Sequence, residues 1–328
     1  MCSRDAMALL LVSSLLLVSG VQATYAGDKP LGTVFQGDMR GNYLFTTGTS
    51  TYSSGLKPGH TCNATFSFSL PTESTVRFGR LYVYWAWSQK DQKAVYPVFQ
   101  VYDTRNPTTP LSLSARYADS KGFVSSYDFY SGTDAYDLPP VDPGENTVTV
   151  VVSQDGAEGS SVLVFGLAAL VVYASPGEPH RQIQVKEGCD LLFSSYGVSP
   201  EMATNDISFE GPLSRETIES AGLFLVAPSG GYSRDIEIGL NSLSVNRLEE
   251  EKTPPLIRTI FSLLFPNYGG KEWSDIFSPD NTTQIGFETK EIRPYLKKEN
   301  NRVAVQDQGD YMQLTNAVLA ITYTGESS

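Results

Sequence analysis

Residues 146–173 read NTVTVVVSQDGAEGSSVLVFGLAALVVY, and residues 301–323 read NRVAVQDQGDYMQLTNAVLAITY. Each stretch is a β-branched run, an acidic turn that contains glycine, and an apolar run that ends at tyrosine. Val, Ile and Tyr favour strands, and Gly with Asp between two such runs is typical of a turn. We therefore expect two strands joined by a turn at the end of each half of the chain.

Two earlier segments repeat in the same order. ATFSFSLP at 64–71 precedes RLYVYWAW at 80–87, and DISFEGPL at 206–213 precedes GLFLVAPS at 222–229. The first of them alternates Phe and Leu with Ser and Thr, which predicts a strand with one buried face. Because the copies stay nearly in register, we predict an all-β protein of two tandem, jelly-roll-like β-sandwich domains that arose by internal duplication.

The N-terminal segment predicts export. Arg4 precedes an apolar stretch at 6–21, and Val21-Gln22-Ala23 has the small residues of a signal-peptidase site. The apolar stretch is shorter than the roughly 20 residues that a membrane span needs. We expect cleavage after Ala23, with Ala26 as the alternative, and a mature chain that is extracellular or at the cell surface.

The mature chain divides at the turn-forming stretch SPGEP, 175–179. The predicted units are a signal peptide at 1–23, a first domain at 24–175 and a second domain at 176–328. The second domain contains an insertion at about 248–266. Within it, apolar residues four apart over 256–265, between prolines, predict one short helix. That helix either packs on its own sandwich or docks a partner.

Charge and hydropathy exclude two classes of partner. The chain has 36 acidic and 24 basic residues, a net charge of −12 and a pI near 4.7. Nucleic acids and anionic membranes both need basic surfaces, so neither is an expected partner. The longest apolar stretch after the signal, 162–173, is too short to span a bilayer, and we expect no transmembrane segment in the mature chain.

Motifs for catalysis are missing from the sequence. The chain has two histidines, and it contains neither a Gly-x-Ser-x-Gly elbow nor a phosphate-binding or dinucleotide fingerprint. We therefore do not expect an enzyme. A pair of carboxylates could still serve glycan hydrolysis or elimination, but composition nominates no pair.

The cysteines and sequons bear on an exported protein. Cys62 and Cys189 remain after cleavage of the signal, and an even pair in an oxidising compartment favours a disulfide. The alternative is two separately buried thiols. Asn63 and Asn281 lie in Asn-x-Thr sequons and are candidate N-glycosylation sites.

Acidic turns and a Tyr-rich segment supply the remaining candidate sites. Asp307 and Asp310 flank Gly309, and such clustered oxygens could hold Ca²⁺ or form a solvated turn; no other cofactor is expected. Aromatic rings beside carboxylates are used both to grip sugars and to pack against neighbouring proteins. The candidate contact residues for a glycan or a protein partner are Tyr127, Asp128, Tyr130, Asp134 and Tyr136.

Several motifs in order along the chain carry a family resemblance. They are GTVFQG at 32–37, RLYVYWAWS at 80–88, EGCDLL at 187–192, DQGDYM at 307–312 and Asn316-Ala317. With these motifs the chain resembles the DUF3344 family, uncharacterised secreted and cell-surface proteins of methanogenic archaea. The resemblance implies an archaeal envelope protein and supplies no catalytic residues.

These observations lead to one expected function and two alternatives. The first is a secreted cell-envelope protein of structural or adhesive role, such as a surface-layer or sheath component. Such a protein would assemble with itself or with other envelope proteins, because unpaired edges of β-sheets can add strands from a neighbour. The alternatives are an extracellular carbohydrate-binding module and a carboxylate-dependent glycan hydrolase or lyase.

Overall fold

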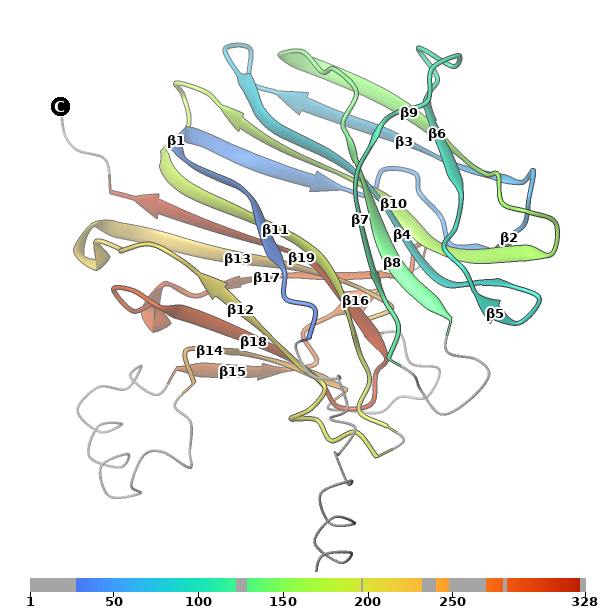
Figure 1. Ribbon diagram of the computed structural model, residues 1–328. Helices are drawn as coiled ribbons and strands as arrows, with labels where there is room; N and C mark the ends of the chain where they lie inside the picture. The colour runs from blue at the N-terminus through green and yellow to red at the C-terminus, as the bar shows by residue number, and fades with distance from the viewer. Residues whose placement is uncertain are drawn as a thin grey trace, which may run out of the picture.

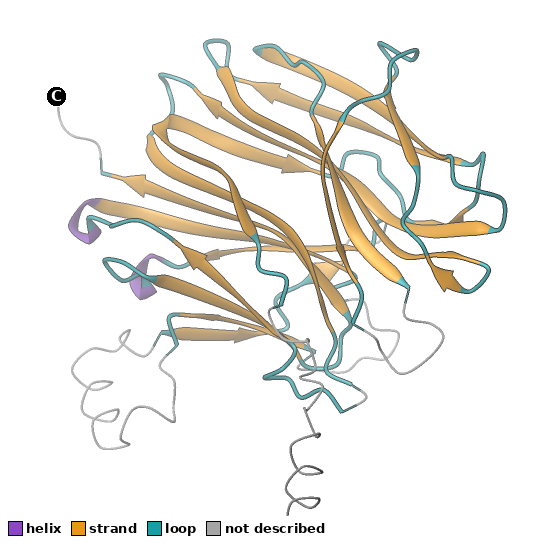
Figure 2. Cartoon of the chain, in the orientation of Figure 1, coloured by secondary structure: helices purple, strands orange, loops and turns teal. Residues whose placement is uncertain are grey.

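The computed structural model describes residues 28–121, 129–195, 197–231, 240–247, 270–279 and 282–324. In this part of the chain the protein is all-β, with antiparallel sheets (Figure 1), as predicted. The helical turns there are two 3₁₀ turns, η1 (Arg215–Thr217) and η3 (Arg293–Tyr295) (Figure 2). The signal segment at 1–23 and the predicted helix at 256–265 lie outside the described residues.

The largest sheet has twelve strands and runs through both halves of the chain. Its path is β16-β17-β13-β19-β11-β1-β10-β4-β8-β7, with β2 beside β10 and β5 beside β4. In chain order, the strands are β1 (Gly32–Thr46), β2 (Ser53–Leu56), β4 (Thr75–Lys90), β5 (Lys93–Ala94), β7 (Leu113–Asp119), β8 (Tyr130–Asp137), β10 (Ser160–Ala174), β11 (His180–Leu192), β13 (Ile218–Pro228), β16 (Ser278–Pro279), β17 (Ile285–Glu291) and β19 (Met312–Tyr323).

Two smaller sheets cover the large one on its outer sides (Figure 1). The first cover sheet has the order β3-β9-β6, and the second has the order β12-β18-β14-β15. Their strands are β3 (Thr61–Leu70), β6 (Phe99–Asp103), β9 (Gly144–Gln154), β12 (Thr204–Phe209), β14 (Asn241–Val245), β15 (Lys271–Ser274) and β18 (Asn301–Asp307). We call β1 to β10 the first half of the molecule and β11 to β19 the second half.

Strand β1 joins the two halves into one sheet. Its residues 32–40 pair with β11, and its residues 41–46 pair with β10. The two halves of the large sheet therefore lie on either side of one strand, and each half keeps one face for its own cover sheet.

Alternation of side chains along the strands separates three large apolar cores from a small fourth cluster. Phe66 of β3 and Trp85 of β4 belong to the core beneath the first cover sheet, and Leu243 of β14 belongs to the core beneath the second. The opposite faces of the two halves share a third core, which includes Tyr84 of β4 and Phe224 of β13. Burial of this shared face holds the halves together, because apolar area leaves water on both.

The pairing order is the same in both halves. In the first half β4 lies between β10 and β8, and β9 lies between β3 and β6. In the second half β13 lies between β19 and β17, and β18 lies between β12 and β14. The repeated sequence segments supply four of these strands in each half, namely β3, β4, β9 and β10 in the first and β12, β13, β18 and β19 in the second. The halves differ at β15, which adds a fourth strand to the second cover sheet.

Candidate functional site

Exposed apolar side chains gather in the first half. Among the described residues, four of the five large hydrophobic side chains that are exposed belong to it: Trp87 (47% exposed), Tyr96 (53%), Val98 (48%) and Leu113 (44%). The second half contributes Phe287 (37%). Because exposed apolar area is unfavourable in water, the first half is the better candidate for contact with another molecule.

The carboxylate of Asp134 in β8 is the centre of a buried network in this half. Arg116 of β7 donates to it twice, from Nε to Oδ1 at 2.7 Å and from Nη2 to Oδ2 at 2.6 Å. Trp85 Nε1 donates to Oδ1 at 3.0 Å, and the Tyr136 hydroxyl donates to Oδ2 at 3.4 Å. The side chain of Asp134 is fully buried, and that of Arg116 is 24% exposed. This bidentate geometry fixes the guanidinium plane.

Gly132 of β8 makes room for this network. A Cβ atom there would lie 2.4 Å from Cζ2 of Trp85 and 2.5 Å from the carbonyl oxygen of Tyr117. Both contacts are shorter than real Cβ contacts allow. The indole of Trp85 can therefore lie against β8 and reach Asp134 only because residue 132 has no side chain.

Two tyrosines form the outer layer above Arg116. The rings of Tyr96 and Tyr130 stack with their centroids 4.4 Å apart and an interplanar angle of 13°. The guanidinium carbon of Arg116 lies 5.9 Å from the Tyr96 ring and 5.8 Å from the Trp85 ring. We call Trp85, Tyr96, Arg116, Tyr130, Asp134 and Tyr136 the aromatic–arginine site. The Tyr96 ring is exposed at its surface, and Asp134 does not use the Nη1 donors of Arg116.

Trp87 is presented by a β-bulge. The register of β4 against β8 shifts between Trp85 and Ser88, and Trp87 has a φ of 55°, in the left-handed region. Large side chains rarely adopt this backbone conformation, which costs about 1–3 kcal/mol. Its Nε1 donates to the hydroxyl of Tyr311 in the second half at 3.2 Å. The bulge therefore aims an exposed indole at the boundary between the halves.

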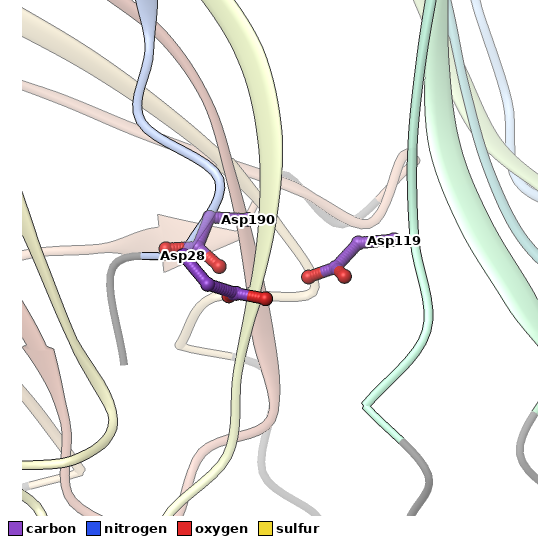
Figure 3. Close-up of side chains that lie close together, drawn as sticks. All are labelled: Asp28, Asp119 and Asp190. Carbon is purple, nitrogen blue, oxygen red and sulfur yellow. The ribbon is translucent and has the colours of Figure 1, made fainter. Parts of the chain in front are cut away.

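A second cluster of charges also joins the halves. Asp28, Asp119 and Asp190 come together with their carboxylate oxygens within 4.8 Å of one another (Figure 3). Lys121 Nζ lies 2.8 Å from Asp119 Oδ2, 2.8 Å from Asp190 Oδ1, and in contact with Asp28. We call these four residues the carboxylate–lysine cluster.

The ionisation of this cluster follows from burial and pairing. Burial raises the pKa of Asp190 to about 6, against the opposing effects of Lys121 and of the Asn205 amide, which donates to Asp190 Oδ2 at 2.6 Å. Burial alone would lower the pKa of Lys121, but Asp190 and Asp119 raise it above its ordinary value. The lysine thus supplies the positive charge that three carboxylates would otherwise take from a metal ion.

Glu187 of β11 is a third buried acidic group. Its Oε1 accepts from the Tyr82 hydroxyl at 2.8 Å and from Arg80 Nε at 3.3 Å, and its Oε2 accepts from the Tyr117 hydroxyl at 3.1 Å. Its side chain is 1% exposed, and burial raises its pKa. These donors come from the first half, so Glu187 connects the two halves.

The predicted contact residues divide between buried and undescribed positions. Tyr127 and Asp128 lie outside the described residues. Tyr130 is half-buried, but Asp134 is fully buried and Tyr136 is 2% exposed. The expectation of an exposed carboxylate and ring at these two positions is therefore corrected. Their side chains point into the first core because even-numbered residues of β8 face the cover sheet.

The predicted disulfide is wrong in this structure. Cys62 and Cys189 are both free, the first partly buried against the first core and the second fully buried. Burial raises the pKa of the Cys62 thiol to about 11 and that of Cys189 well above its ordinary value. Cys62 lies in the first cover sheet and Cys189 lies in the large sheet. An even number of cysteines does not indicate which sheet each one belongs to.

The other predicted sites are placed as follows. Asn63 is exposed on β3, and Asn281 lies outside the described residues. Asp307 accepts backbone N–H groups from Ser194, Gly309 and Asp310, and Asp310 accepts from Gly231 N at 2.6 Å and Asn241 Nδ2 at 2.8 Å. These bonds cap turns. Among the described residues, the acidic group spaced for a cation is the carboxylate–lysine cluster instead.

Sequence reasoning missed Arg116, Tyr96 and Lys121. Arg116 and Tyr117 alternate along β7, a pattern that indicates opposite faces but not which one meets Asp134. Nothing near Lys121 in the sequence pointed to Asp190. These partners are far apart in the chain, and only the sheet order brings them together.

The family match follows the same strands. A family model described as "Protein of unknown function (DUF3344)" matches residues 24–322. The chain belongs to the DUF3344 family. No curated protein matches this DUF3344 chain. None of the described residues of the DUF3344 protein form a helix with the length and hydropathy to cross a membrane.

Solved structures are similar to the DUF3344 chain at low scores. The major capsid protein P2 from bacteriophage PM2 has a TM-score of 0.21 and 10% identity, over 87% of this chain and 100% of that one. A peptide-N(4)-(N-acetyl-β-D-glucosaminyl) asparagine amidase has a TM-score of 0.24 and 9% identity, over 88% and 98%. Latent PorU from Porphyromonas gingivalis has a TM-score of 0.24 and 9% identity, over 91% and 22%. At these TM-scores the likenesses carry no argument about function.

Proposed function

We propose that this DUF3344 protein is a secreted component of an archaeal cell envelope with a structural or adhesive role. The proposal rests on the concentration of exposed large apolar side chains in the first half, among them Tyr96 and Trp87. Aromatic residues are enriched where proteins contact one another, because they add apolar area with a polar tip. The apolar N-terminal segment at 1–23 supports export.

We also propose that each half is a jelly-roll-like sandwich and that the pair arose by duplication. The pairing order that the halves share supports this proposal. In such an arrangement the molecule has two sets of sheet edges. Among the described residues, β7 ends the large sheet on the first half and carries the exposed Leu113. An edge strand with unpaired backbone groups can pair with a neighbouring copy.

Assembly is tested by the size of the mature chain, residues 24–328. We expect light scattering and negative-stain microscopy to show particles much larger than a monomer. Tyr96→Ala should reduce the assembled fraction at least severalfold, because it removes the aromatic side chain that is most exposed among the described residues. Phe287→Ala, an exposed aromatic of the second half, is the matched control and should assemble as the natural protein does.

A monodisperse monomer under all conditions would contradict assembly and favour a second candidate, a carbohydrate-binding module. The specific observation that favours it is the exposed Tyr96 ring beside Arg116, which pairs a flat apolar face with hydrogen-bond donors. In that case a glycan array should detect binding that Tyr96→Ala abolishes. Binding that survives this change would exclude the aromatic–arginine site as its location.

A further inference from the structure

A pocket with an unusual charge lies at one end of the second half. It has a volume of about 390 Å³ and is lined by Arg215, Glu216, Ile218, Arg293, Pro294 and Lys298. The two 3₁₀ turns η1 and η3, drawn in purple in Figure 2, contribute residues to its lining. A hydrogen bond from Leu213 N to Lys298 O at 2.7 Å fixes one loop against the other. We call it the two-arginine pocket.

The cations of this pocket have few acidic partners among the described residues. Six other described arginines have an ion pair with a carboxylate: Arg80, Arg105, Arg116, Arg181, Arg247 and Arg302. The guanidinium groups of Arg215 and Arg293 have no such partner among the described residues. Lys298 lies 4.0 Å from Glu216, an exposed pair that contributes little. Three cations thus face one carboxylate in a chain of net charge −12.

The corresponding place in the first half is built differently. There the start of β4 and the loop after β8 line a groove of about 470 Å³, which includes Arg80, Asp137 and Pro139. Arg80 is paired with Asp137 and with Glu187, so that groove is neutralised internally. The start of β4 and the loop after β8 correspond to the start of β13 and the loop after β17. The first pair lines a neutralised groove, and the second pair lines a cationic pocket.

The size and openness of the two-arginine pocket indicate its ligand. A volume near 390 Å³ is at the lower end of small-molecule sites and larger than an inorganic oxyanion needs. Its cationic side chains are exposed, so a bound unit can continue into solvent on either side. Arginine donors match carboxylate oxygens in pairs. We infer that this pocket binds the carboxylate of an acidic sugar residue within a polysaccharide.

Calorimetric titration of the mature protein tests this inference. We expect tetragalacturonate to bind and the neutral maltotetraose to give no signal. Arg215→Ala combined with Arg293→Ala should weaken tetragalacturonate binding at least tenfold, and Glu216→Gln should strengthen it severalfold because it removes the one opposing charge. Raising the salt from about 50 mM to about 500 mM should weaken binding, since the charges are exposed and screened.

Arg77→Ala is the matched control, because Arg77 is also exposed and has no carboxylate partner among the described residues. It should bind tetragalacturonate as the natural protein does. Binding that is unchanged in the double variant, or equal for the neutral sugar, would overturn the inference. Sulfate that binds as tightly as the oligosaccharide would also overturn it, by showing a site for an inorganic anion only. Far-ultraviolet circular dichroism verifies that the variants remain folded.

Discussion

In the first half of the molecule three strands cover the core, and the groove at its end has an arginine that two carboxylates neutralise. In the second half four strands cover the core, and the pocket at its end has two arginines with no carboxylate partner in the described part of the chain. The strand order beneath these differences is the same. A shared scaffold therefore carries two different surfaces, one aromatic and one cationic. The halves differ in strand β15, in the short strands β2 and β5 of the first half, and in the charged side chains at their ends.

The largest expected effect comes from removing a contact that joins the two halves. Lys121→Met removes the only cation of the carboxylate–lysine cluster and leaves Asp119 and Asp190 buried with uncompensated charge. We expect the free energy of unfolding to fall by about 3–5 kcal/mol, as for other buried pairs that lose one partner.

Chemical denaturation at pH 7 measures this change. Lys93→Met, an exposed lysine of the short strand β5, is the control and should stay within about 0.5 kcal/mol of the natural protein. A similar small effect for Lys121→Met would mean that the cluster does not hold the halves together.

The pH dependence of stability sharpens the same point. Folding raises the pKa of Asp190 to about 6, above the roughly 3.9 of an unfolded aspartate, so the folded state binds the extra proton between these values. Protonation of Asp190 therefore contributes fully to the free energy of unfolding below about pH 4. This contribution, up to about 3 kcal/mol, is lost as the pH rises through about 6.

The Asp190 contribution can be isolated by comparing denaturation midpoints at pH 4 and pH 7. Asp190→Asn should remove this part of the pH dependence, whereas Asp91→Asn, on an exposed turn, should keep it. If the natural protein and Asp190→Asn show the same change between the two pH values, the raised pKa of Asp190 is refuted.

The smallest expected loss of stability comes from aromatic side chains at the edges of the two apolar cores. Trp273 of β15 packs on the second core and contacts the Tyr295 ring edge-on, with the ring centroids 5.6 Å apart. Trp273→Ala should therefore lower the free energy of unfolding by about 2 kcal/mol. Tyr96→Ala in the first half removes a ring that is 53% exposed, and it should cost under about 1 kcal/mol. Thermal unfolding of both variants compares them. A larger loss for Tyr96→Ala would assign that ring to the core rather than to a contact surface.

Local pattern predicted much of the fold. The alternation in Thr65 to Leu70 indicated a strand with Phe66 and Leu70 buried, and both are buried in β3. In β4, the bulge between Trp85 and Ser88 gives Trp87 an exposed position that alternation along the strand does not indicate. A bulge adds one residue against the partner strand, so its position depends on the partner and not on the local sequence.

The candidate sites were less predictable than the strands. Tyr130, Asp134 and Tyr136 do come together around one carboxylate, but the partner that determines their role is Arg116, on the neighbouring strand. The positions of the two free thiols also depend on tertiary structure. Cys62 and Cys189 each follow the burial pattern of their own strand, and the layers that separate them come from sheet order.

By itself, the sequence determined that the chain forms β-strands joined by turns in a repeated order, because the alternation and turn chemistry that specify them lie within a few residues of one another. The tertiary structure alone decided which charges meet, that Lys121 lies among three carboxylates and that Arg215 and Arg293 share a pocket. Those contacts join residues from different strands and loops. Their energies depend on burial, which exists only after the sheets have packed.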